Sequence, residues 1–87
     1  MTKEKLTKEE IETRVKQVIA SVTNIEEKKI KSNLHLQNDL GVDSFTAIEM
    51  IYNAEDEFGI NISDEELLKV TTVDDIVNIV KQKIQHE

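Results

Sequence analysis

Residues 43–59 read DSFTAIEMIYNAEDEFG and carry the clearest helix signal in this chain of 87 residues. Asp43 is a favourable helix N-cap, and Gly59 suits the left-handed cap that ends many helices. We therefore predict a helix from Ser44 to Phe58. Successive helical residues turn by about 100°. One side of this helix then carries the apolar residues that can face a core, namely Ala47, Met50, Ile51, Ala54 and Phe58.

The same helix carries a second apolar stripe on a different side. Phe45, Ile48 and Tyr52 are spaced three and four residues apart. The acids that flank this stripe are Glu49, Glu55 and Asp56. One interpretation is a wide buried face, with the aromatic rings packed under a loop. The other is a partly exposed apolar patch with an acidic border, which suits docking to a partner protein. The sequence leaves both interpretations open.

Capping signals on either side of this helix predict three more helices. Capping boxes fit three pairs of residues: Thr7 with Glu10, Ser63 with Glu66, and Thr72 with Asp75. The first and last of these helices have apolar residues at helical spacing, and the middle one is short. The last helix would face the core with Val73, Ile76, Val77, Val80 and Ile84. The predicted fold is all-α, a small four-helix bundle of three main helices and one short helix.

A long segment separates the first two main helices, from about residue 23 to residue 43. It has no helical pattern, but Leu34, Leu36 and Leu40 are expected to fold inward and to make it an ordered loop. Loops of this length in small domains are often functional.

Composition limits the class of protein. The length suits one domain over residues 1–87, with frayed ends at 1–6 and 86–87. There is no Cys, which excludes disulfides and thiolate sites. No segment approaches the ~20 apolar residues that cross a bilayer, and the N-terminus lacks an apolar signal core. We therefore expect a cytoplasmic protein that is a monomer and does not insert into membranes.

Negative charge is concentrated in the middle of the chain. The formal net charge is −7, and residues 32–68 contain nine acidic residues but no Lys or Arg. This distribution argues against binding to nucleic acid, because phosphates require clustered basic side chains. A solvated acidic surface and a docking face for basic partners both fit it.

Neither a catalytic nor a metal-binding residue is predicted. A serine nucleophile needs an adjacent base, and the only histidines are His35 and His86. His35 lies in the long loop without an evident partner. A calcium-binding loop ending at Glu49 or at Glu66 fails, because neither register has the required Gly at position six.

Ser44 lies in the first turn of its helix, between the two apolar stripes. The unpaired N–H groups and the dipole of a helix N-terminus favour a phosphate at such a position. An ordinary cap-region serine fits the composition equally well.

The residues around Ser44 resemble the signature of acyl carrier proteins. That signature commonly reads D-L-G-x-D-S-L, followed by an apolar residue and Glu on the same helix. The matching residues here are Asp39, Leu40, Gly41, Asp43, Ser44, Ile48 and Glu49. The likeness continues through residues 55–60, 62–66 and 70–73, so it extends over nearly the whole chain.

This resemblance implies that Ser44 receives 4′-phosphopantetheine from coenzyme A through a phosphodiester. A phosphopantetheinyl transferase would form this bond with a magnesium ion, and Asp43 resembles the acid placed near that ion. The thiol of the arm would carry acyl groups as thioesters to acyl-transfer and synthase enzymes with basic docking patches. Partner docking is implied for Phe45, Ile48, Glu49, Tyr52, Glu55 and Asp56. Core or acyl-chain contacts are implied for Ala47, Ile51, Ala54, Phe58, Ile62, Val73 and Ile76.

Several departures from the family pattern bear on the pathway. Phe45 replaces the usual Leu, and Tyr52 stands where Met is common in bacterial fatty-acid carriers. D-S-F also occurs in D-alanyl carriers and in some polyketide carriers, whereas the G-G-x-S of peptidyl carriers is missing. Fatty-acid, polyketide and other specialised roles therefore stay open. The alternative from another class is an unmodified acidic module for protein interaction.

Overall fold

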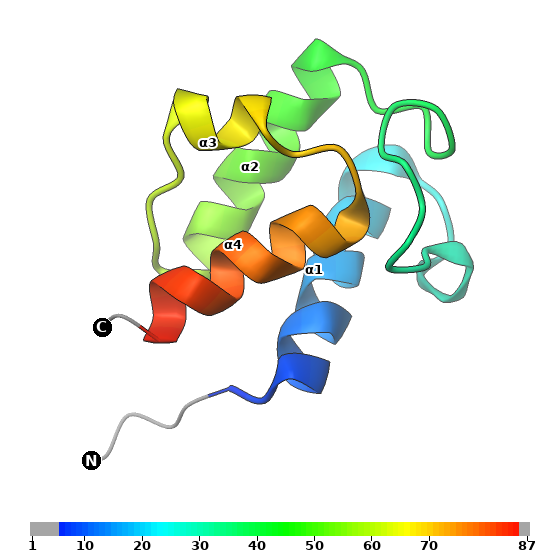
Figure 1. The fold of residues 1–87 in the computed structure, drawn as a ribbon. Helices are drawn as coiled ribbons and strands as arrows, with labels where there is room; N and C mark the ends of the chain where they lie inside the picture. The colour runs from blue at the N-terminus through cyan, green and yellow to red at the C-terminus, as the bar shows by residue number, and fades with distance from the viewer. Residues whose placement is uncertain (1–5, 86–87) are drawn as a thin grey trace.

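The computed structural model describes residues 6–85, and in this part of the chain it is a bundle of four α-helices without a β-strand (Figure 1). The predicted all-α fold is confirmed. A single 3-10 turn, η1, lies in the long segment between the first two helices. The bounds are α1 Lys8–Thr23, η1 Glu27–Lys29, α2 Ser44–Phe58, α3 Asp64–Leu68 and α4 Val73–Gln85.

Local capping sets the ends of these helices. The Thr7 hydroxyl accepts a hydrogen bond from the Glu10 N–H at 3.1 Å, and the Thr7 N–H donates to the Glu10 carboxylate at 2.8 Å. Ser63 and Glu66 form the same reciprocal box at the start of α3. Gly59 ends α2 with φ +66°, a left-handed conformation that glycine adopts without a steric penalty. The predicted start and stop of α2 are confirmed.

The core lies where α1 packs against both α2 and α4. Its fully buried residues include Ile11 and Ile19 of α1, and Met50 of α2. Ile51, Ala54, Ile62, Val73 and Ile76 are buried as expected. Ala47 and Phe58 are only half-buried and pack against the edge of the core. Phe58 is the last residue of α2, so its ring lies at the margin of the bundle.

The segment between α1 and α2 is held by the core and by backbone pairing. Leu36 and Leu40 are buried as predicted, whereas Leu34 is half-buried. Backbone hydrogen bonds join this segment to the start of α4, from the Leu36 N–H to the Thr71 carbonyl at 2.9 Å and from the Val73 N–H to the Leu34 carbonyl at 3.1 Å. Ile30 and Val42 are also buried, which the loop pattern did not indicate.

The ends of the chain were expected to be frayed at residues 1–6 and 86–87. Leu6, within the segment expected to be frayed, packs against the core through a half-buried side chain. Residues 1–5 and 86–87 lie outside the described residues. None of the helices in residues 6–85 combines the length and apolar character that crossing a bilayer requires.

Candidate functional site

Ser44 is the first residue of α2, and its side chain is exposed. Asp43 caps the helix, because its Oδ1 accepts a hydrogen bond from the Thr46 N–H at 2.8 Å. This bond holds the pKa of the Asp43 carboxyl below its usual value. Asp43 is therefore ionised at neutral pH. An exposed hydroxyl thus stands beside a carboxylate, at the end of the helix where a negative group is favoured.

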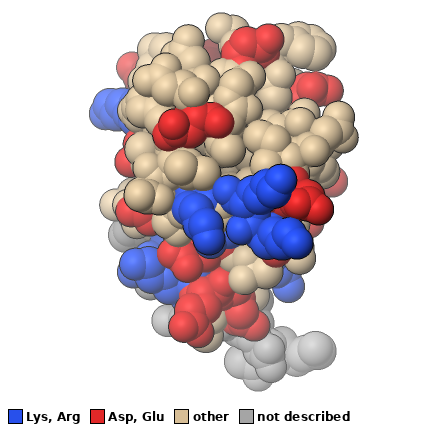
Figure 2. All heavy atoms as spheres, turned by 90° about the vertical axis from the view of Figure 1, so that its right-hand side faces the viewer, with Lys and Arg blue, Asp and Glu red and all other residues tan. Residues whose placement is uncertain are grey.

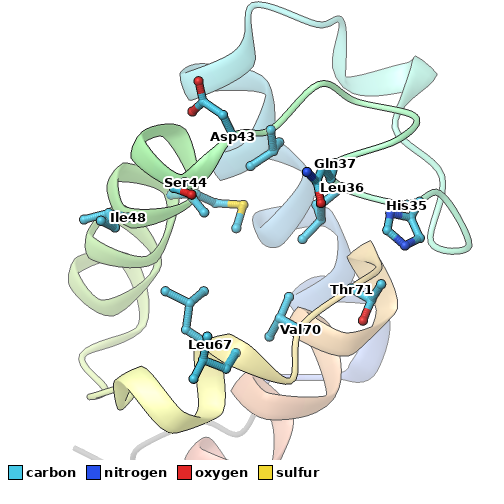
Figure 3. Close-up of a pocket in the computed structure, with 13 residues that line it drawn as sticks. His35, Leu36, Gln37, Asp43, Ser44, Ile48, Leu67, Val70 and Thr71 are labelled. Carbon is cyan, nitrogen blue, oxygen red and sulfur yellow. The ribbon is translucent and has the colours of Figure 1, made fainter.

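A groove of about 390 Å³ opens next to Ser44, between α2, α3 and the segment around Leu36. Figure 3 shows Ser44 and Ile48 on one side of it and His35 and Thr71 on the other. Its floor is apolar and consists of Leu36, Val42, Ala47, Met50, Leu67 and Val70. Ala47, Leu67 and Val70 are only half-buried, so the bundle does not fill this space with its own side chains.

The outer side of α2 presents the second apolar stripe to solvent. The exposed fractions are 71% for Phe45, 45% for Ile48 and 65% for Tyr52. Glu49 and Asp56 are exposed on the same helix. These exposures favour the interpretation of an apolar patch with an acidic border over that of a wide buried face.

Residues 13–80 match a family model described as the phosphopantetheine attachment site. The chain is also similar to a solved acyl carrier protein from Enterococcus faecalis, whose structure was examined for its high thermal stability. Their identity is 33% over 90% of this chain and 99% of that one, with a TM-score of 0.73. The chain belongs to the acyl carrier protein family. Members of this family are carriers and not catalysts, and they work with partner enzymes.

The residues of this acyl carrier protein fit a phosphopantetheine group at Ser44. The hydroxyl is exposed, so a modifying enzyme can reach it. The first turn of α2 favours a phosphate, and the apolar floor of the groove lies next to Ser44. Within residues 6–85, no group of three or more metal-ligating side chains is placed to hold a metal ion.

The groove and the core divide the residues expected to make core or acyl-chain contacts. Of the seven residues named for core or acyl-chain contacts, only Ala47 lines the groove. Five of the other six are buried in the core, and Phe58 is half-buried at the far end of α2. Sequence reasoning missed Met50, Leu67 and Val70 as groove residues. For Leu67 the available signal was the adjacent pair Leu67 and Leu68, because neighbouring helical residues point about 100° apart and one of the two faces away from the core.

Glu55 has a structural role in addition to the docking role expected for it. Its Oε2 accepts a hydrogen bond from the Ile62 N–H at 2.7 Å, and the residue is half-buried. This contact ties the end of α2 to the loop that leads to α3. Leu68 of α3 was not assigned to docking, yet it is 85% exposed and lines the mouth of the groove.

Basic residues of the carrier gather away from the groove. Figure 2 shows Lys and Arg side chains in the middle of one face. Lys16, Lys28 and Lys31 line a shallow hollow between α1 and η1, and this hollow shares no lining residue with the groove. These three lysines form no ion pair with another described residue. The positive charge of this hollow is thus separated from Ser44 and the groove, whereas Arg14 of α1 contacts the Glu57 carboxylate of α2 at 3.5 Å.

Proposed function

We propose that this acyl carrier protein bears acyl groups as thioesters on a 4′-phosphopantetheine arm attached to Ser44, within one carrier domain over residues 1–87. The observation that carries the proposal is the exposed Ser44 hydroxyl on the first turn of α2, directly beside an apolar groove. The 4′-phosphopantetheine group supplies a terminal thiol that forms thioesters with acyl groups. The groove supports binding of the apolar part of such a cargo, because its floor is partly exposed and apolar.

The chain is, in this proposal, a substrate of a phosphopantetheinyl transferase that uses coenzyme A. The ionised Asp43 carboxylate next to Ser44 supports a contact with the magnesium ion that such a transferase brings. Asp43 keeps the helix start in place through its bond to Thr46. It therefore orients Ser44 as well as supplying negative charge.

Partner enzymes of fatty-acid, polyketide or related biosynthesis dock, in this proposal, on the outer side of α2. Phe45, Ile48 and Tyr52 supply apolar contact, and the exposed Glu49 and Asp56 attract basic patches. Glu55 contributes to the same surface through the carboxylate oxygen that does not accept the bond from Ile62. We further propose that the carrier acts as a cytoplasmic monomer.

The test of the function is the intact mass after incubation with coenzyme A, magnesium and a broad-specificity phosphopantetheinyl transferase. The wild-type chain should gain one phosphopantetheine, and Ser44→Ala should gain none. Ser21→Ala removes another exposed serine, on α1, and should be modified like the wild type. An unmodified wild type beside a modified control carrier would contradict the proposal and favour the unmodified docking module.

A further inference from the structure

The groove beside Ser44 is not uniform along its length. Its floor is apolar, but its side remote from α2 ends in the polar residues His35 and Thr71. Figure 3 shows these two residues together at one end, opposite Ser44 and Ile48. An acyl chain that enters the groove from the side of Ser44 and crosses the floor therefore arrives at polar groups.

Backbone pairing holds His35 and Thr71 in place. An antiparallel bridge joins His35 to Thr72, and the Leu36 N–H donates to the Thr71 carbonyl at 2.9 Å. The His35 N–H donates to the Asp39 carboxylate at 2.7 Å. The Thr71 N–H donates to the Asp75 carboxylate at 2.8 Å. Both residues thus belong to a preorganised corner where two segments meet.

The side chains at this corner retain hydrogen-bonding capacity. The imidazole of His35 makes one bond within residues 6–85, in which Nδ1 accepts from the Asn38 N–H at 3.4 Å. Neither His35 Nε2 nor the Thr71 hydroxyl has a partner among the described residues. A plain hydrocarbon chain laid against them would remove their water and offer no bond in return, which is unfavourable.

We propose that the groove selects acyl cargo bearing an oxygen substituent remote from the thioester, hydrogen-bonded by His35 and Thr71. This inference rests on the proposed function, because the cargo must be attached through Ser44. An oxygenated chain keeps apolar contact with Leu36, Leu67 and Val70 and also satisfies the polar corner. Sites that hydrogen-bond a substrate hydroxyl discriminate strongly against the analogue that lacks it.

The experiment compares carriers loaded at Ser44 with octanoyl groups, plain or carrying one hydroxyl at successive positions. Mass spectrometry establishes loading, and calorimetry gives the thermal midpoint of each loaded form. We expect a hydroxylated form to melt about 3–8 °C above the plain octanoyl form, the shift that one net hydrogen bond gives a domain of this size. Backbone amide signals of Leu36 and Thr71 should shift for that form.

Single substitutions test whether His35 and Thr71 cause the higher thermal midpoint of the hydroxylated form. Thr71→Val and His35→Phe should each reduce the difference in thermal midpoint between the hydroxylated and the plain octanoyl forms. Thr13→Val changes another exposed threonine, on α1, and should keep the full effect. Equal midpoints for all loaded forms, or a difference that survives in both groove variants, would overturn this inference alone. Absence of loading would overturn the proposed function together with it.

Discussion

Helices α2 and α4 have similar lengths but expose their apolar residues very differently. In α4, the side chains of Val73, Ile76, Val77 and Val80 are at most 1% exposed. In α2, one side is buried and the other carries three of the four large exposed apolar residues found in residues 6–85. Burial of the apolar residues on one side of a helix is enough for it to pack against a core. The second side of α2 is therefore free to meet partners, whereas α4 serves the fold.

The charged side chains on the outer side of α2 also differ from those that connect helices. The acids on the outer side of α2, Glu49 and Asp56, form no ion pair with another described residue. Lys83 of α4 instead contacts the Glu66 carboxylate of α3 at 2.8 Å. Lys83 thus connects α4 to α3, and Glu57 of α2 contacts Arg14 of α1 at 3.5 Å. The acids on the outer side of α2, Glu49 and Asp56, are left for the solvent or for a basic partner.

Ile76→Ala should have the largest effect, because it opens a cavity on the side of α4 that faces the core. The side chain is 1% exposed. Replacement of such a residue costs about 2–5 kcal/mol. Urea unfolding should show a lower midpoint with an unchanged slope. A loss below about 1 kcal/mol would mean that α4 is not the main structural helix.

Phe58→Ala tests the end of α2, where the core side meets solvent. The ring is half-buried, so we expect a loss of about 2 kcal/mol, smaller than the 3–5 kcal/mol typical of a fully buried Phe. Thermal unfolding of this variant beside Ile76→Ala gives the comparison. A larger loss of stability for Phe58→Ala than for Ile76→Ala would show that α2 contributes more to the stability of the fold than α4.

Three carboxyl groups make the starts of helices sensitive to acid. The bond from Thr46 lowers the pKa of Asp43, the bond from Lys83 lowers that of Glu66, and the bond from the Thr72 N–H lowers that of Asp75. Their ordinary values are 3.8 for Asp and 4.5 for Glu. A lowered pKa in the folded state means that folding favours the ionised form.

The stabilisation from these groups should be complete above about pH 5 and lost as the pH falls through the lowered pKa values. Thermal midpoints measured from neutral pH downward should decrease in that acidic range. Asp75→Asn should decrease less steeply, because one of the three groups no longer titrates. A midpoint that is constant down to pH 2 would show that these caps contribute nothing to stability.

Glu49→Lys should leave stability within about 0.5 kcal/mol, since the residue is exposed. It should slow acyl transfer to a partner enzyme and weaken the dependence of the rate on salt. Glu27→Lys makes the same change of charge in η1, away from α2, and should behave like the wild type. Equal slowing by both variants would assign the effect to net charge and remove the docking role of α2.

The outer side of α2 also marks the limit of prediction from sequence. The spacing of Phe45, Ile48 and Tyr52 identified a separate stripe but fitted burial and exposure equally well. The roles expected for Glu55 and Phe58 depended on neighbours from other segments. The Ile62 backbone is seven residues from Glu55, beyond the reach of helical spacing arguments.

The bounds of α2, the caps at Thr7, Asp43 and Ser63, and the position of Ser44 at a helix start were determined by sequence alone. Such features depend on bonds between residues no more than about four positions apart. Only the tertiary structure decided where the groove lies, because Leu36, Met50 and Leu67 come from three segments that meet through packing. The same holds for the polar corner at His35 and Thr71, which long-range backbone pairing brings together.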